Sequence, residues 1–256
     1  MKYLLYLTFM FMLMGGHPAT ACTGQTPCEL GERSYHVRVP DQWDGKSELP
    51  LLLHFHGVGR QGDLIVRHGR IATGAVAQNV LLIAPNGLNR TWSFREPSSP
   101  DSVFALEILD DVAKRYPIDK DRIFVSGFSW GSNMAWRFAC DYGDKFTALL
   151  GVAGTLSQQE NCTVAPKVVR QVYGLDDKAL RFPMGPGMDT SYPVALWRRV
   201  MGCGEGELEG AWNARPFLTF ERTVWDCPNG RVSMDVHPEG HLLPHDWIPL
   251  QVEDIL

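Results

Sequence analysis

Short apolar runs recur along the chain at the spacing expected of buried strands. Leu49–Phe55 and Val80–Ala84 are almost entirely apolar, as strands covered on both faces should be. Ser34–Val39 instead alternates polar and apolar residues, which predicts an edge strand. Further apolar runs that fit buried strands are 122–126, 148–152, 167–173 and 232–236. The pattern therefore predicts a sheet in which most strands are buried on both faces.

Helical periodicity fills the segments between these runs. In Ser102–Arg115 the apolar side chains fall on one face, with Asp101 or Ser102 predicted to cap the helix and Pro117 to end it. Further helices are predicted at 130–140, 192–201 and 245–256. Strands that alternate with helices predict an α/β fold with a mostly parallel, doubly wound sheet and the active site at the carboxyl ends of the strands.

The first 21 residues have the features of a secretory signal peptide. Lys2 is followed by an apolar run from Leu4 to Met14, and Ala19-Thr20-Ala21 supplies the small residues that precede a cleavage site. The run is too short to span a bilayer of about 30 Å. Cleavage leaves a single domain, 22–256, that is secreted or periplasmic. A lipoprotein acylated at Cys22 is the alternative, although Ala19 stands where a lipobox usually has Leu.

The strongest chemical signal is the segment Gly127-Phe128-Ser129-Trp130-Gly131. It matches G-x-S-x-G between a predicted strand and a predicted helix, the context of the nucleophile turn in the α/β-hydrolase fold. The turn strains the serine backbone, and larger side chains at the two glycines would collide. Ser129 is therefore the predicted nucleophile.

A serine hydroxyl needs a base, and in this fold the chain order is Ser, then Asp or Glu, then His. Of the three histidines beyond Ser129, His241 follows Gly240 on a loop after the last predicted strand and is the predicted base. His245 is the second candidate, and His237 lies at the strand's end. Their even spacing could suggest zinc on a helix, but Pro238, Gly240 and Pro244 argue against one.

The acid is expected on the loop after the strand 167–173, where Asp176 and Asp177 compete for the role. An oxyanion hole normally uses the N–H after the nucleophile, here Trp130, and one from the loop after the third strand. His56-Gly57-Val58 occupies that loop, so Val58 N–H is the second predicted donor. His54 and His56 precede Ser129 in the chain and are predicted to shape the loop through hydrogen bonds.

All six cysteines lie beyond the predicted signal peptide, which suggests three disulfides in an exported chain. Six cysteines allow 15 pairings, so the sequence does not fix them. Neighbour order suggests Cys22–Cys28, Cys140–Cys162 and Cys203–Cys227. The absence of a CxxC pair argues against a metal site. No cofactor is implied, and the net charge of −5 argues against a nucleic-acid partner.

From about Cys22 to Trp247 the chain resembles the secreted polyhydroxybutyrate depolymerase and feruloyl-esterase-like α/β-hydrolases. The segments that carry the resemblance are 116–119, 122–140 and 151–155, together with Gly240-His241. In this family a G-T-A-D segment carries the triad acid. Its counterpart here is Gly174-Leu-Asp-Asp177, so the resemblance implies Asp177.

The chain departs from the family near the expected substrate pocket. Tyr173 stands where members often have His, Trp130 replaces a small or polar residue, and 181–189 replaces a short polar loop. A second, polymer-binding domain is also absent from the sequence. These departures bear on the substrate more than on the reaction.

The resemblance implies a secreted serine carboxylic-ester hydrolase of the polyhydroxybutyrate depolymerase type, acting on a small or polymeric ester through an acyl-enzyme. One alternative is a feruloyl or acetyl xylan esterase, for which Trp92 and Trp130 could contact a phenolic or sugar group. Tryptophans are, however, more often core residues. Another class of protein would be a hydrolase fold that binds without catalysis, although no triad residue is missing here.

Overall fold

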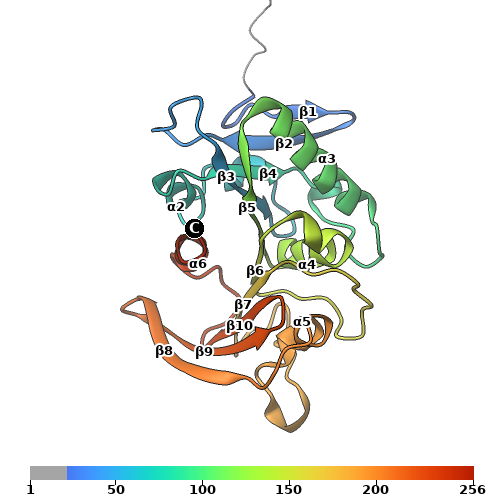
Figure 1. Cartoon of the computed structure of the whole chain (residues 1–256), viewed down its shortest axis with the longest axis vertical. Coiled ribbons are helices and arrows are strands. Elements are labelled where there is room, and N and C mark those ends of the chain that lie inside the picture. Colours follow the sequence, from blue (N-terminus) through green and yellow to red (C-terminus); the bar gives the residue numbers. More distant parts are fainter. Residues whose placement is uncertain (1–21) are drawn as a thin grey trace, which may run out of the picture.

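Ten strands form one sheet in the computed structural model, which describes residues 22–256 (Figure 1). Their spatial order is β1-β2-β4-β3-β5-β6-β7-β10-β9-β8. The strands from β4 to β10 in this order are parallel, and antiparallel strands flank them on both sides. The bounds are β1 Cys28–Leu30, β2 Arg33–Arg38, β3 Leu49–Phe55, β4 Leu81–Pro85, β5 Ile118–Phe128, β6 Ala148–Val152, β7 Val168–Gly174, β8 Glu207–Arg215, β9 Leu218–Cys227 and β10 Gly230–His237.

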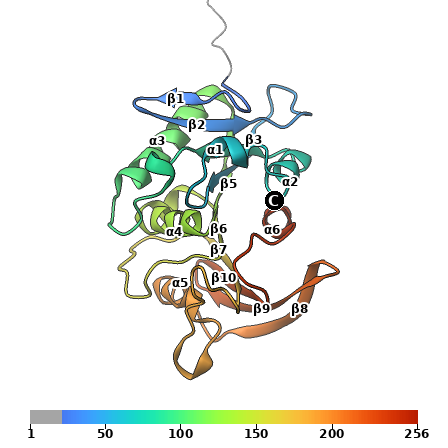
Figure 2. The ribbon, with the colours of Figure 1, turned by 180° about the vertical axis from the view of Figure 1, so that it is seen from behind.

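Helices cover both faces of the sheet, as Figures 1 and 2 show from opposite sides. On one face lie α3, α4 and α5, and on the other α2 and α6. The bounds are α1 Gly62–Ile65, α2 Ala72–Ala77, α3 Pro100–Arg115, α4 Trp130–Tyr142, α5 Ala195–Val200 and α6 Trp247–Glu253. This arrangement confirms the predicted α/β fold with a mostly parallel, doubly wound sheet. The predicted signal peptide, 1–21, lies outside the described residues.

Each predicted strand is present, but the sheet extends further at both ends. The predicted edge strand, β2, is not an edge, because β1 pairs with it antiparallel. The hairpin β8–β9 was not predicted, and it places β10 inside the sheet. Glu207, Glu209, Glu221 and Arg222 interrupt the apolar pattern of this hairpin. A strand that exposes one face to solvent and carries several charged residues lacks the continuous apolar run that predicts a buried strand.

Several helix ends differ from the prediction, and two of these differences have a clear local cause. Helix α3 is capped by Ser99, whose hydroxyl accepts from Ser102 N–H, and not by Asp101 or Ser102. Pro100 follows this cap as the first residue of the helix. Proline suits that position because it has no N–H group that would lack a partner there. The last helix begins at Trp247 and not at His245, because Asp246 adopts a left-handed backbone that interrupts it.

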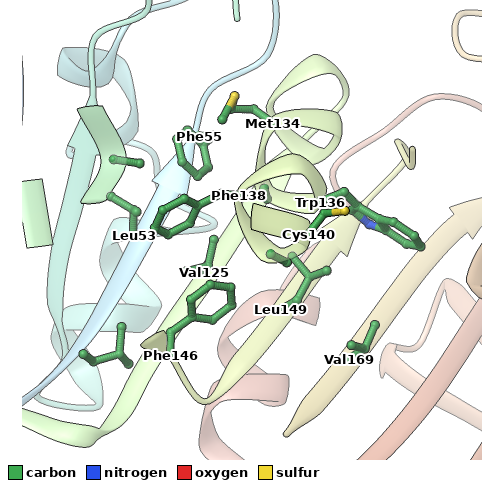
Figure 3. Close-up of a cluster of buried hydrophobic side chains, with 14 of the residues drawn as sticks. Leu53, Phe55, Val125, Met134, Trp136, Phe138, Cys140, Phe146, Leu149 and Val169 are labelled. Atoms are coloured by element: carbon green, nitrogen blue, oxygen red, sulfur yellow. The ribbon is translucent and has the colours of Figure 1, made fainter. Parts of the chain in front are cut away.

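Apolar side chains from both sheet faces form the core. Figure 3 shows the larger cluster, in which Phe138 and Trp136 of α4 pack over Val125 and Leu149 of the sheet. The rings of Phe138 and Phe146 are stacked, with centroids 5.5 Å apart. Helix α4, whose N-cap is Ser129, is therefore fixed to the centre of the sheet by large buried side chains.

The structure confirms the three disulfides in neighbour order, Cys22–Cys28, Cys140–Cys162 and Cys203–Cys227. They tie the first strand to the segment before it, α4 to the loop after β6, and β9 to the segment after α5. Within residues 22–256, no helix has the length and apolar character needed to cross a bilayer.

A buried carboxylate joins the hairpin to the rest of the sheet. Asp235 of β10 is fully buried and accepts two hydrogen bonds from Arg222 of β9, at 2.8 and 2.7 Å. It also accepts from the indole N–H groups of Trp212 in β8, at 2.9 Å, and Trp247 in α6, at 2.7 Å. One side chain thus connects four elements, and its charge is balanced by the guanidinium of Arg222.

Replacing Asp235 by Ala should strongly destabilise the protein. The change leaves Arg222 and two indole N–H groups without their acceptor, and breaking a buried ion pair costs about 3 to 5 kcal/mol. Urea unfolding checks this. The control is Asp226→Ala on the same hairpin, where the side chain is 90% exposed and little change is expected. Equal stability of the two variants would contradict the role of Asp235.

Candidate active site

Ser129 lies at the junction of β5 and α4 in a strained backbone conformation. Its φ is 58° and its ψ is −126°, which an L-residue rarely adopts. A side chain at Gly127 would collide with the backbone of Gly131, and one at Gly131 with the carbonyl of Phe55 in β3. Both glycines are therefore required by close backbone packing, as the sequence predicted. The turn presents Ser129 at the N-terminus of α4, where free N–H groups gather.

His241 and Asp177 meet at the same edge of the sheet. The His241 Nδ1 atom lies 2.6 Å from Asp177 Oδ2, and the Asp177 side chain is fully buried. The other carboxylate oxygen, Oδ1, accepts from Ala179 and Leu180 N–H, both at 2.9 Å. The Phe128 ring packs on the His241 ring with centroids 4.9 Å apart. These contacts fix both the carboxylate and the imidazole plane.

The neighbouring aspartate occupies a different environment. Asp176 is 64% exposed and lies 3.3 Å from the Lys178 ammonium. Among the described residues, no hydrogen bond or ion pair joins Asp176 to His241. Of the two aspartates that the sequence left open, the structure places Asp177 against His241 and Asp176 toward solvent.

Ser129 and His241 line one cavity of about 710 Å³. Its walls are mostly apolar and come from the segment 60–71, from Phe128 and from Leu243. Arg60, Arg67 and His68 also line it. A volume in this range suits a small organic group. The arrangement can place an acyl chain beside a nucleophilic hydroxyl and a histidine.

The loop after β3 lies against the nucleophile turn. A Cβ atom on Gly57 would be 3.7 Å from Ser129 Cβ and 3.5 Å from the Phe128 carbonyl oxygen. Val58 lines the cavity with Ser129, and its side chain is half exposed. Trp130 follows Ser129 as the first residue of α4. Both predicted oxyanion donors are thus on segments adjacent to Ser129.

His56 determines how the Gly57–Val58 peptide is oriented. The Gly87 N–H donates to His56 Nε2 at 3.1 Å, so the neutral ring carries its proton on Nδ1. That Nδ1–H donates to the Gly57 carbonyl at 2.9 Å. Because N–H and C=O point in opposite directions across a trans peptide, Val58 N–H points away from His56. Burial lowers the pKa of His56 and so favours this neutral form.

Four further residues considered in the sequence, Trp92, Trp130, His237 and His245, do not line this cavity. Trp92 is buried, does not line the cavity with Ser129, and donates its indole N–H to the His56 carbonyl at 2.7 Å, so it supports the loop. Trp130 packs edge-on against Phe94. His237 ends β10 and His245 precedes α6, so the three late histidines do not share a helix. Within residues 22–256, no three potential ligands gather in a way that could hold a metal ion.

Sequence reasoning did not find the cavity wall. Ile65, Ile71 and Leu243 line the cavity, although Leu243 is far from the other two in the chain. Short helices such as α1 and α2 lack the periodicity that would indicate a buried face. The anchoring of His56 by Gly87 and Trp92 was also missed, because it joins separate loops.

The chain was compared with known proteins. No protein-family model matches it. Over 236 residues it is 26% identical to probable feruloyl esterase C of Aspergillus niger, covering 89% of this chain and 82% of that protein. It is 24% identical to feruloyl esterase D of Neurospora crassa, covering 70% of each. Among solved structures, an acetyl xylan esterase from Aspergillus awamori has a TM-score of 0.66 at 15% identity, covering 88% of this chain and 95% of that one.

The fold and the turn at Ser129 define the class, an α/β-hydrolase. The chain is similar in sequence to curated feruloyl esterases, and it is a carboxylic ester hydrolase. These relatives confirm the feruloyl-esterase part of the resemblance seen in the sequence, and they argue against a hydrolase fold that binds without catalysis.

Replacing His56 by Ala should lower kcat about tenfold or more with a smaller change in KM. The Gly57–Val58 peptide loses the bond that orients it, and a misplaced oxyanion donor acts mainly on the transition state. Steady-state kinetics on a nitrophenyl ester measure both constants. His36→Ala is the control, since His36 is another buried histidine, bonded instead to the Gly24 carbonyl. A His56→Ala enzyme with the wild-type kcat would disprove this role.

Proposed function

We propose that Ser129, His241 and Asp177 form the catalytic triad of this ester hydrolase. The observation that carries the proposal is the 2.6 Å contact between His241 and the buried Asp177, beside the cavity that Ser129 also lines. Asp177 holds the Nδ1–H tautomer, which leaves Nε2 to accept the serine proton. Nucleophile, base and orienting acid come from the loops after β5, β10 and β7, in the chain order Ser, Asp, His.

The reaction proceeds in two halves. Ser129 Oγ attacks the ester carbonyl carbon while His241 takes the hydroxyl proton, and the carbonyl oxygen becomes an oxyanion. The carbonyl re-forms, the bond to the alkoxy oxygen breaks, and His241 gives its proton to the leaving alcohol. Water, deprotonated by His241, then attacks the acyl-enzyme. The carboxylic acid leaves, and Ser129 recovers its proton.

Trp130 N–H and Val58 N–H are the proposed oxyanion donors. Trp130 begins α4, so its N–H belongs to the first turn and has no partner within the helix. The orientation that His56 imposes leaves Val58 N–H directed away from the Gly57 carbonyl. Each donor of this kind stabilises a transition state by about 3 kcal/mol.

For the substrate, we favour an ester with an aromatic acyl group of the feruloyl type. Two curated relatives are named feruloyl esterases, and the large, mostly apolar cavity next to Ser129 suits a flat ring. The sequence first pointed to a polyhydroxybutyrate depolymerase, and that polyester remains the second candidate. An acetyl ester would leave most of the cavity empty.

The protein is proposed to be exported. Residues 1–21 would be removed as a signal peptide, leaving the domain 22–256 outside the cytoplasm. Three disulfides within that domain are typical of exported proteins. Cys22 pairs with Cys28, and a paired thiol is not available for a lipid anchor, which favours a secreted protein over a lipoprotein.

Ser129→Ala should abolish turnover of a short nitrophenyl ester, because no other hydroxyl lies on the nucleophile turn. Thermal unfolding would show whether the variant is folded. Turnover at the wild-type rate by a folded variant would refute the triad.

The two aspartates provide a matched pair. Asp177→Asn should lower kcat by orders of magnitude, because an amide can hold the wrong histidine tautomer. Asp176→Asn removes the same charge one residue away, at an exposed position, and should change kcat little. Kinetics on one ester compare them. A larger loss in Asp176→Asn would reverse the assignment.

A substrate panel tests the acyl group. Methyl ferulate should be hydrolysed with a higher kcat/KM than hydroxybutyrate oligomers or acetylated xylan, because its ring buries apolar surface in the cavity. Release of acid from each ester is the measurement. A higher kcat/KM for the hydroxybutyrate oligomers would favour a polyhydroxybutyrate depolymerase instead.

A further inference from the structure

A buried histidine that the triad does not use lines the active-site cavity. His54 of β3 is fully buried, and its Nδ1 lies 2.8 Å from the Ser126 hydroxyl of β5. Its other ring nitrogen, Nε2, is buried and has no hydrogen-bond partner among the described residues. His54 is also part of the cavity lining that includes Ser129 and His241. A buried polar atom without a hydrogen-bond partner, on a residue that lines this cavity, needs an explanation.

The protonation state of His54 follows from its surroundings. Burial lowers its pKa to about 3, so the ring is neutral and carries one proton. Ser126 is buried too, and among the described residues its hydroxyl has no hydrogen-bond partner other than His54 Nδ1. The hydroxyl hydrogen is satisfied only if it is donated to Nδ1, which places the ring proton on Nε2. The unpaired atom is therefore a hydrogen-bond donor.

His54 lies some distance from the reaction centre. It pairs in register with Ser126, and Ser126 precedes Ser129 by three residues along β5 and the turn. At the rise of a strand this separation is roughly 10 Å. A ring joined to the ester carbonyl by a two-carbon linker has a comparable length. The donor is thus placed for the far end of an acyl group, and not for the carbonyl.

We propose that His54 is a specificity-determining residue, whose Nε2–H donates a hydrogen bond to an oxygen at the distal end of the substrate's acyl group. The inference rests on the proposed function, because it takes the Ser129 cavity to be the acyl pocket. A bound oxygen acceptor pairs the buried N–H, whereas an acyl group with only carbon there leaves it unpaired. A site of this kind discriminates against analogues that lack the polar atom.

Two esters of nearly equal size test the proposal on the unaltered enzyme. Methyl 4-hydroxycinnamate carries a distal oxygen, and methyl 4-methylcinnamate carries a methyl group in its place. The wild-type kcat/KM for the hydroxylated ester should exceed that for the methylated ester by about tenfold or more. A ratio near or below one would overturn the proposal without any variant, while hydrolysis of both esters would leave the triad intact.

Variants then assign the preference to His54. In His54→Leu the ratio should fall toward one through loss of activity on the hydroxylated ester alone. His54→Gln keeps an N–H donor and should restore part of the ratio. Ser126→Ala removes the partner that fixes the ring proton and should lower the ratio without changing the pocket lining. The control Ile71→Ala alters an apolar wall residue, so both esters should be affected alike.

The role of His54 and the catalytic triad can fail independently, and the ratio of kcat/KM for the two esters distinguishes these failures. If Ser129→Ala is inactive but the wild-type preference persists unchanged in folded His54→Leu, the triad stands and the role of His54 is wrong. If Ser129→Ala retains turnover, the proposed function fails before the ratio is considered.

Discussion

The active site depends on a close backbone contact between the nucleophile turn and the neighbouring strand. Gly131, at the start of α4, lies against the carbonyls of Phe55 and His56 at the end of β3. Any side chain there would separate the two segments. Because α4 is fixed by its buried aromatic residues, this contact sets the position of Ser129 relative to the loop that carries Val58. The strained backbone at Ser129 persists because packing on both sides over-determines it.

Hydrogen bonds also fix the loops on either side of the nucleophile turn. The His56 ring joins Gly57 to Gly87 in the segment after β4, and Trp92 of the same segment donates to the His56 carbonyl. On the other side, Leu175 N–H donates to the His237 carbonyl at 2.8 Å, which ties the loop that carries Asp177 to the end of β10. The Asp235 network in turn holds β10 to the hairpin and to α6. The three loops of the proposed triad are thus fixed to one rigid sheet edge.

The residues proposed for catalysis and those that form the cavity wall come from different parts of the fold. The proposed catalytic groups follow the chain order and loop positions typical of the α/β-hydrolase fold, while the cavity wall comes from short helices and from Leu243. His54 adds a buried polar atom to this apolar surface. The pocket therefore combines apolar burial, which favours many acyl groups, with one directional contact that can distinguish among them.

The sequence alone predicted the mostly parallel sheet, the candidate nucleophile Ser129 and the chain order of the candidate site residues. Continuous apolar runs indicated buried strands, and Gly127 and Gly131 around Ser129 indicated a turn that tolerates no larger side chain. These are local patterns, so they can be read from neighbouring residues. The hairpin β8–β9 was missed because its charged residues, such as Arg222, look solvated in the sequence, and only the fold brings Asp235 to Arg222. Only the tertiary structure separated Asp177 from Asp176, since burial and contact with a residue more than sixty positions away decide which aspartate meets His241. It also revealed the cavity and the unpaired nitrogen of His54, because both arise where segments distant in the chain converge.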